Sequence, residues 1–162
     1  MRKSGGTKYA ALLAAILTCT LSLSAAAQAI ARAADLRAEA RAAQESGAPL
    51  VIFFSESGCP YCARARRDHL APLANDPASR GRFALVEIDI RSTAPLIAFS
   101  GERTTHAAFA VLNAIKWVPT LVFVGADGKA LADPLIGLTV PDLYQGQLER
   151  RLEQAAEALR RP

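Results

Sequence analysis

Apolar and polar positions along the chain alternate between two kinds of pattern. Continuous apolar runs rich in Val, Ile, Leu and Phe are typical of strands that are covered on both faces. The run at 49–55 is of this kind, and further strands are predicted at 82–90, at 120–125 and, after the turn at Asp127-Gly128, at 129–137. The last two, joined by an Asp-Gly turn, predict an antiparallel hairpin.

Segments rich in helix-forming residues separate these runs. They lie at 34–45, 59–73 and 104–115, and a fourth segment at 141–160 has apolar residues at helical spacing. Strands that alternate with helices predict parallel pairing, and the final hairpin adds antiparallel strands. We therefore expect an α/β domain whose mixed sheet carries helices on both faces.

The first 33 residues have the pattern of an export signal. Arg2, Lys3 and Lys8 precede an apolar run at 10–23, which is too short to span a bilayer comfortably. Small residues follow, and the A-x-A pattern predicts cleavage after Ala29 or Ala33. An uncleaved anchor is the alternative. With the signal removed, residues 34–162 would form one periplasmic domain, of a size that suits a single core.

The export signal also accounts for the positive charge of the chain. The formal net charge is +4, and residues 1–33 contain the basic residues Arg2, Lys3, Lys8 and Arg32 but no acidic residue. Without them, 15 basic residues face 15 acidic ones. A neutral domain gives no support to a nucleic-acid partner, and we expect none.

Cys59 and Cys62 are the only cysteines outside the signal. Paired thiols form disulfides in an oxidising compartment, but so small a loop constrains the unfolded chain very little. A C-x-x-C motif after a strand in an α/β pattern instead indicates a redox couple. The alternative is zinc, for which C-x-x-C is half of a four-ligand cage. His69 and His106 are not arranged as its second half, so we predict no metal and assign neither histidine a role.

The local sequence predicts different chemistry for the two cysteines. Cys59 follows a buried strand and Gly58, and Pro60 suits the first position of a helix. A sulfur at a helix N-terminus is stabilised as the thiolate, with a lowered pKa. Cys62 lies one turn into the same helix, where it can attack a mixed disulfide. We predict that Cys59 is the nucleophile and that Cys62 resolves.

Residues 35–160 resemble an exported member of the thioredoxin superfamily. Three matches carry the resemblance: "CPYC" at 59–62 after a strand, "WVPT" at 117–120, and "VFVGADGKAL" followed by a run to Gly137. Within the superfamily, the chain is most similar to periplasmic thioredoxins of sulfur-oxidation or cytochrome-maturation systems (SoxW-like). The resemblance implies a thioredoxin fold and a thiol:disulfide oxidoreductase. It also implies a cis bond between Val118 and Pro119, in a loop that faces the cysteines.

The resemblance further implies how the protein acts. Substrate chains are expected to contact Pro60, Tyr61, Val118 and Pro119. The Pro119-Thr120 loop favours a reductase of protein disulfides. Two alternatives stay open: an oxidant that introduces disulfides, and a non-catalytic module that holds a metal or a partner.

The expected partners are protein disulfides or dithiols and a membrane protein that donates or accepts electrons. We expect a monomer with no cofactor beyond the redox-active Cys59–Cys62 disulfide.

One departure from the family concerns proton transfer. Thioredoxins have a buried aspartate six residues before the first cysteine, and Phe53 occupies this position here. The nearest carboxylate in sequence is Glu56, which is equally well explained as a solvated loop residue. The group that takes the proton of Cys62 is therefore open.

A second departure is an insert at 91–103, which lengthens the connection between 89 and 119. Because it follows a parallel strand, we expect it near Cys59. Two interpretations are open. The insert is a wall that selects partners, or it is a surface loop that packs through Leu96, Ile97 and Phe99.

Overall fold

The computed structural model describes residues 30–138 and 140–161. Residues 1–29 of the signal expected at 1–33, which include its charged start and apolar run, lie outside the described residues. Within the described part of the chain, no helix is both long and apolar enough to cross a membrane.

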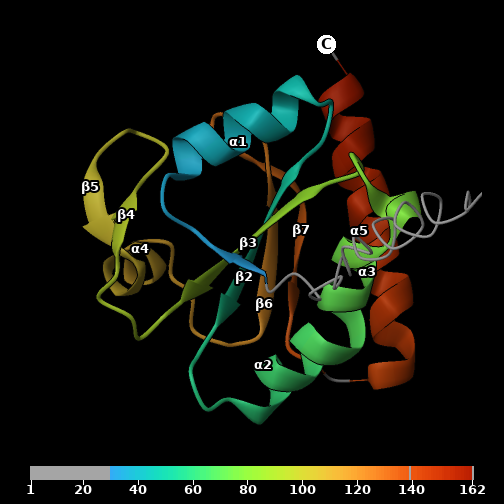
Figure 1. Cartoon of the computed structure of the whole chain (residues 1–162), viewed down its shortest axis with the longest axis horizontal. Helices are drawn as coiled ribbons and strands as arrows, with labels where there is room; N and C mark the ends of the chain where they lie inside the picture. The colour runs from blue at the N-terminus through green and yellow to red at the C-terminus, as the bar shows by residue number, and fades with distance from the viewer. Residues whose placement is uncertain (1–29, 139, 162) are drawn as a thin grey trace, which may run out of the picture.

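A five-stranded mixed sheet lies at the centre of the described part of the domain, in the order β1-β3-β2-β6-β7 (Figure 1). The strands are β1 (Ala31–Arg32), β2 (Leu50–Ser55), β3 (Ala84–Asp89), β6 (Thr120–Val124) and β7 (Ala130–Ile136). Strand β3 is parallel to β1 and β2, whereas β6 is antiparallel to both β2 and β7. The predicted mixed sheet is confirmed, and the short edge strand β1 is an addition to it.

Helices cover both faces of the sheet, as predicted (Figure 1). They are α1 (Leu36–Glu45), α2 (Pro60–Ala65), α3 (Ala71–Asn75), α4 (His106–Leu112) and α5 (Pro141–Arg160). A π-helical turn, Arg66–Leu70, joins α2 to α3, so the helix expected at 59–73 is irregular in its middle. Pro72 gives a local reason, because it cannot donate the backbone N–H that a regular α-helix requires.

Strand β2 is buried along its whole length, which explains its continuous apolar sequence. Val51 and Phe53 pack into the core layer beneath α2 and α5. Leu50, Ile52 and Phe54 pack into the opposite layer, which contains α1 and α4. The strand thus joins the two halves of the core and holds the loop before Cys59 at its carboxyl end.

The insert forms a separate hairpin of β4 (Pro95–Ile97) and β5 (Arg103–Thr105). Leu96 is buried in the core layer of α1 and α4, and the Ile97 N–H donates to the Ala34 carbonyl at 2.9 Å. At the tip, the Phe99 ring lies against Gly128, where a Cβ atom would come within 2.7 Å of it. The hairpin therefore packs through its apolar residues, as one of the two interpretations expected.

The tip of the hairpin lies far from the cysteine pair. Gly128 is in the turn after β6, and β6 runs antiparallel to β2, so this turn is at the end of the sheet opposite Cys59. Figure 1 accordingly shows the hairpin beside α4, on the side away from α5. The start of the insert is near the site, because Arg91 Nε lies 3.0 Å from the Glu56 carboxylate and the Ser92 N–H donates to the Asp89 carbonyl at 3.0 Å. The expectation that the insert as a whole lies near Cys59 is wrong.

Candidate active site

Cys59 is the residue that caps the amino end of α2. Gly58 before it has a φ of 83°, a left-handed conformation that lets the chain turn from β2 into the helix. Pro60 takes the first helical position, and the Cys62 backbone N–H donates to Cys59 Sγ at 3.1 Å. The Cys59 sulfur therefore lies at the start of the helix with a backbone donor aimed at it. Both cysteines are free thiols in this structure.

Cys62 is in a different environment. It is only 1% exposed and packs in the core layer with Ala65 and Tyr144. Burial, and then the hydrogen bond with Cys59, raise the pKa of the Cys62 thiol to about 12. Arg66 acts in the opposite direction through its charge. At neutral pH, Cys62 is therefore a protonated thiol that outside reagents do not reach.

This difference predicts selective alkylation of the reduced protein, tested with Cys19→Ser so that the two site thiols are alone. Iodoacetamide should modify Cys59 and leave Cys62 nearly unmodified from neutral pH to about pH 10, since the buried thiol ionises only as the pH approaches its raised pKa of about 12. Peptide mass spectrometry against pH measures both rates. In urea the two cysteines should react alike. Faster labelling of Cys62 in the folded protein would reverse the assigned roles.

The loop before β6 lies next to the cysteine pair. The Val118–Pro119 peptide bond is cis, and Val118 packs against the core layer that contains Cys62. The Gly137 N–H donates to the Pro119 carbonyl at 2.7 Å, and Thr120 Oγ1 donates to the Trp117 carbonyl at 2.8 Å. The first contact holds the loop against the end of β7, and the second fixes the conformation of the loop itself.

The remaining residues expected to contact substrate are on the surface. Pro60 is exposed, and Tyr61 is 60% exposed. Trp117 before the loop, with 72% of its surface exposed, is a third large side chain open to a partner. Val118 is half-buried and the Pro119 side chain is buried. That Pro60, Tyr61, Val118 and Pro119 bind substrate stays a prediction.

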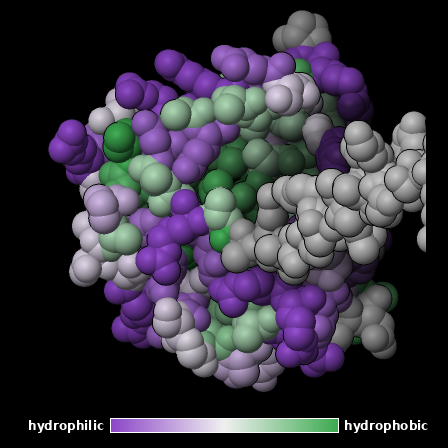
Figure 2. Space-filling model, in the orientation of Figure 1, coloured by the Kyte–Doolittle hydropathy of each residue, from purple (hydrophilic) through white to green (hydrophobic). Residues whose placement is uncertain are grey.

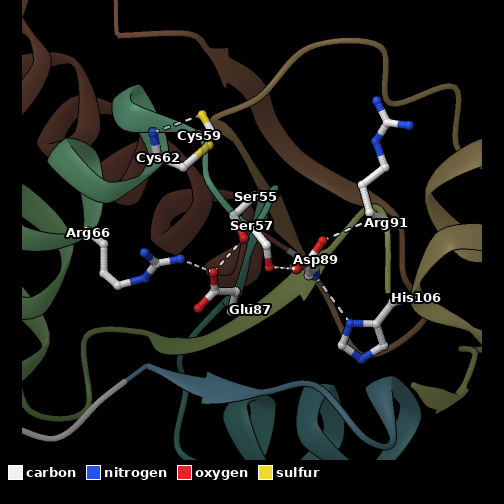
Figure 3. A network of polar contacts seen from close by, with 9 residues as sticks. All are labelled: Ser55, Ser57, Cys59, Cys62, Arg66, Glu87, Asp89, Arg91 and His106. Atoms are coloured by element: carbon white, nitrogen blue, oxygen red, sulfur yellow. Dashed lines mark hydrogen bonds and ion pairs between the residues drawn. The ribbon is translucent and has the colours of Figure 1, made fainter. Parts of the chain in front are cut away.

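A polar pocket of about 390 Å³ opens beside Cys59. Its lining mixes both signs of charge with two hydroxyls, and it includes Arg32, Ser55, Glu56, Ser57, Cys59, Arg66, Glu87 and Asp89. Ser55 Oγ donates to Glu87 Oε1 at 2.5 Å, and Arg66 forms an ion pair with the same oxygen (Figure 3). The Arg66 guanidinium also lies 5.4 Å from the centre of the Phe53 ring.

Asp89 organises the loop that precedes Cys59. Its carboxylate accepts from Ser57 Oγ at 2.5 Å and from the Arg91 backbone N–H at 2.9 Å (Figure 3). Burial raises the pKa of Asp89, but these hydrogen bonds outweigh burial and leave the pKa below its ordinary value. The group therefore stays ionised at neutral pH and keeps the loop in place.

His106 connects this loop to the start of the domain. Its Nδ1 accepts the Asp89 backbone N–H at 3.2 Å, so the proton of the neutral ring is on Nε2, which donates to the Ala33 carbonyl at 2.9 Å. The side chain is fully buried. His106 thus has a structural role that the sequence did not reveal. His69 is half-buried, with Nδ1 3.3 Å from Gln145 Oε1.

Sequence reasoning also missed Glu87 and its two partners. A signal was present, because Glu87 and Asp89 alternate with apolar residues in a buried strand and must share one face. In the register of the sheet, Glu87 is opposite Phe53. Glu56, the carboxylate nearest in sequence, instead pairs with Arg91. Nowhere in residues 30–138 and 140–161 do three or more His, Cys, Asp or Glu side chains form a group that could hold a metal ion.

A family model for the thioredoxin-like domain matches residues 36–152. The chain therefore belongs to this family, and its fold is the thioredoxin fold. Mitochondrial thioredoxin 3 from Saccharomyces cerevisiae is a structural neighbour at 19% identity and a TM-score of 0.51, covering 76% of this chain and 93% of that one.

Two further solved structures are similar at lower TM-scores. The periplasmic thioredoxin SoxS from Paracoccus pantotrophus matches at 20% identity and a TM-score of 0.46, covering 66% of this chain and 98% of that one. Trxlp from Edwardsiella tarda matches at 24% identity and a TM-score of 0.48, covering 67% and 88%. The search of curated proteins gave no match.

Proposed function

We propose that this protein is a periplasmic thiol:disulfide oxidoreductase that reduces protein disulfides through Cys59 and Cys62. The observation that carries the proposal is the asymmetry of the pair. A half-exposed sulfur accepts the Cys62 N–H at 3.1 Å, and the second thiol is buried one turn along the same helix. This arrangement suits a nucleophile that partners can reach and a resolver that they cannot.

The reaction needs two exchange steps. The Cys59 thiolate attacks a partner disulfide, one partner sulfur leaves as a thiolate and takes up a proton, and a mixed disulfide forms. Cys62 then loses its proton and attacks Cys59 Sγ, which releases the second partner sulfur. Two electrons and two protons pass to the partner, and a Cys59–Cys62 disulfide remains. The pair is the redox centre, and the proposal requires no other cofactor.

Substrate chains are proposed to lie across the exposed Pro60 and Tyr61 and to contact the loop of Val118, which is half-buried, and Pro119, whose side chain is buried. Support comes from the position of the Val118 loop against the cysteine layer and from the exposed ring of Tyr61. A membrane protein would return electrons to the Cys59–Cys62 disulfide. We retain the SoxW-like placement, the monomeric state and the lack of a nucleic-acid partner as proposals from the sequence.

Export to the periplasm is proposed from the residues before the domain. Of the two cleavage points, the one after Ala29 leaves β1 attached, together with the Ala33 carbonyl that accepts the His106 hydrogen bond. Cleavage after Ala33 would remove both. We therefore favour a mature chain that starts at Ile30, four residues earlier than the later cleavage point would give.

The direction of electron flow can be tested with the Cys19→Ser protein and insulin. The reduced protein should cleave insulin disulfides, and a Cys59→Ser variant should not. Equilibration with glutathione should place the potential nearer to the about −270 mV of thioredoxin than to the about −120 mV of a strong oxidant. A potential near the upper value, with rapid transfer of the disulfide to reduced proteins, would support the oxidant instead.

A further inference from the structure

The second exchange step leaves one proton without an evident acceptor. Cys62 is a buried thiol, and Phe53, its fully buried neighbour in the same core layer, is apolar. We propose that Glu87 accepts the proton of Cys62 across the polar pocket beside Cys59. The inference rests on the proposed function, because only a resolving cysteine needs to lose its proton at this point.

Glu87 is held in place from two sides. Ser55 Oγ donates to Glu87 Oε1 at 2.5 Å, and Arg66 pairs with the same oxygen. Figure 3 shows Ser55 between the two cysteines and Glu87, with Arg66 on the far side of the carboxylate. Both contacts fix the position of the carboxylate on the wall of the pocket that Cys59 also lines.

The pocket provides a path for that proton. Cys59, Ser55 and Glu87 all line it, and about 390 Å³ is room for several water molecules. Its charged and hydroxyl lining supplies the polar partners that such waters need. Cys62 does not line the pocket itself; it is buried next to Cys59, with its backbone N–H 3.1 Å from Cys59 Sγ. The Ser55 hydroxyl and pocket water can therefore relay a proton from Cys62 to Glu87.

Other ionisable groups around the pair fit this role less well. They are Cys59, Arg32, Glu56, Arg66 and Asp89 on the pocket wall, and Tyr144 of α5, which shares the core layer of Cys62. Asp89 holds Ser57 and the Arg91 backbone N–H, and Glu56 pairs with Arg91, so neither of these carboxylates is joined to Ser55, the hydroxyl of the proposed relay. Among the described residues the buried Tyr144 hydroxyl has no hydrogen-bond partner, and a neutral phenol cannot store the proton.

In the mixed disulfide, the Cys62 proton moves to Glu87, and the Cys62 sulfur forms a bond to Cys59 Sγ. The bond between Cys59 and the partner sulfur breaks, and its electron pair leaves with the partner as a thiolate. Glu87 then returns the proton to that thiolate or to solvent. The positive charge of Arg66 favours the negative charge that develops on the Cys62 sulfur.

The test follows the second step alone, in the full chain with Cys19→Ser. Cys59 is converted to a mixed disulfide with thionitrobenzoate, and the coloured thiol that Cys62 releases is followed by stopped flow against pH. Glu87→Gln keeps the size of the side chain but removes the base. Release at pH 7 should slow by about 100-fold, and its rate should rise tenfold per pH unit as hydroxide replaces Glu87. Glu56→Gln, in the same pocket, should match the wild type.

Glu87→Asp keeps a carboxylate and should restore much of the wild-type release rate and the wild-type pH profile. Formation of the mixed disulfide by Cys59 should be equally fast in every variant. Release from Glu87→Gln at the wild-type rate, or with an unchanged pH profile, would overturn the inference. Faster release would also overturn it, since Glu87 would then only neutralise Arg66. If wild-type protein never releases the thiol, the proposed function itself fails, and the inference fails with it.

Discussion

A Cys62→Ser variant should lose turnover in protein disulfide reduction and accumulate as a mixed disulfide through Cys59. Its nucleophile is intact, because Cys59 remains half-exposed at the amino end of α2, and the backbone N–H of residue 62 remains as a donor. A serine hydroxyl cannot attack the mixed disulfide to form a second S–S bond. Insulin reduction should fall to the uncatalysed background, while non-reducing gels and mass spectrometry show the covalent adduct.

Cys59→Ser is the matched control for this experiment. The buried Cys62 thiol is not accessible to a protein disulfide, so this variant should neither turn over nor form an adduct. Applied to a periplasmic extract, the Cys62→Ser trap would also capture natural partners. Turnover by Cys62→Ser at a rate near that of the wild type would remove Cys62 from the mechanism.

Replacement of His106 by leucine should lower the free energy of unfolding by about 2 to about 6 kcal/mol. The substitution leaves the Asp89 N–H and the Ala33 carbonyl without their partner in a buried site, at about 1–3 kcal/mol each. Leucine fills much of the space of the ring, so lost hydrogen bonding is the main cause. Urea unfolding at neutral pH, followed by circular dichroism, measures the change.

His69→Leu is the corresponding control, because His69 is only half-buried and its contacts to Gln145 and the Tyr144 ring lie near the surface. It should cost less than about 1 kcal/mol. Equal losses in the two variants would show that His106 contributes only its packing. A normal stability for His106→Leu would mean that water replaces both hydrogen bonds.

The main elements of the fold could be predicted because they follow from local patterns. Strand β2 is continuously apolar since both of its faces are buried, and α5 has the bounds expected from its apolar spacing. The position of Cys59 at a helix start follows from Gly58 and Pro60. Strand β1 could not be predicted, because two residues show no periodicity and it forms only by pairing with β3.

Long-range contacts determined what the sequence did not reveal. The insert packs away from Cys59 because Phe99 meets Gly128 across the fold, a contact between residues far apart in the chain. The carboxylate that we propose as the proton acceptor, Glu87, is on β3 and not on β2. The sequence could not show this, because Phe53 and Glu87 are neighbours only in the register of the sheet. The role of His106 likewise depends on Ala33, which no local pattern connects to it.

The pocket side of the site (Figure 3) is more charged than its substrate side. In Figure 2, hydrophilic and hydrophobic residues are interspersed across the visible face. The large apolar side chains that are exposed near the motifs are Tyr61 and Trp117. This division suits a protein that binds partner chains on one side of Cys59 and transfers protons on the other.

A count of free thiols tests the central claim most directly. The folded Cys19→Ser protein is reduced, freed of reductant and titrated with a thiol reagent in denaturant, and a second sample is first oxidised with oxidised glutathione. A dithiol couple predicts two thiols per chain after reduction and none after oxidation, with mass spectrometry showing a Cys59–Cys62 disulfide. Two thiols after oxidation, or thiols that react in the folded protein only once a chelator is added, would contradict a redox role for the pair.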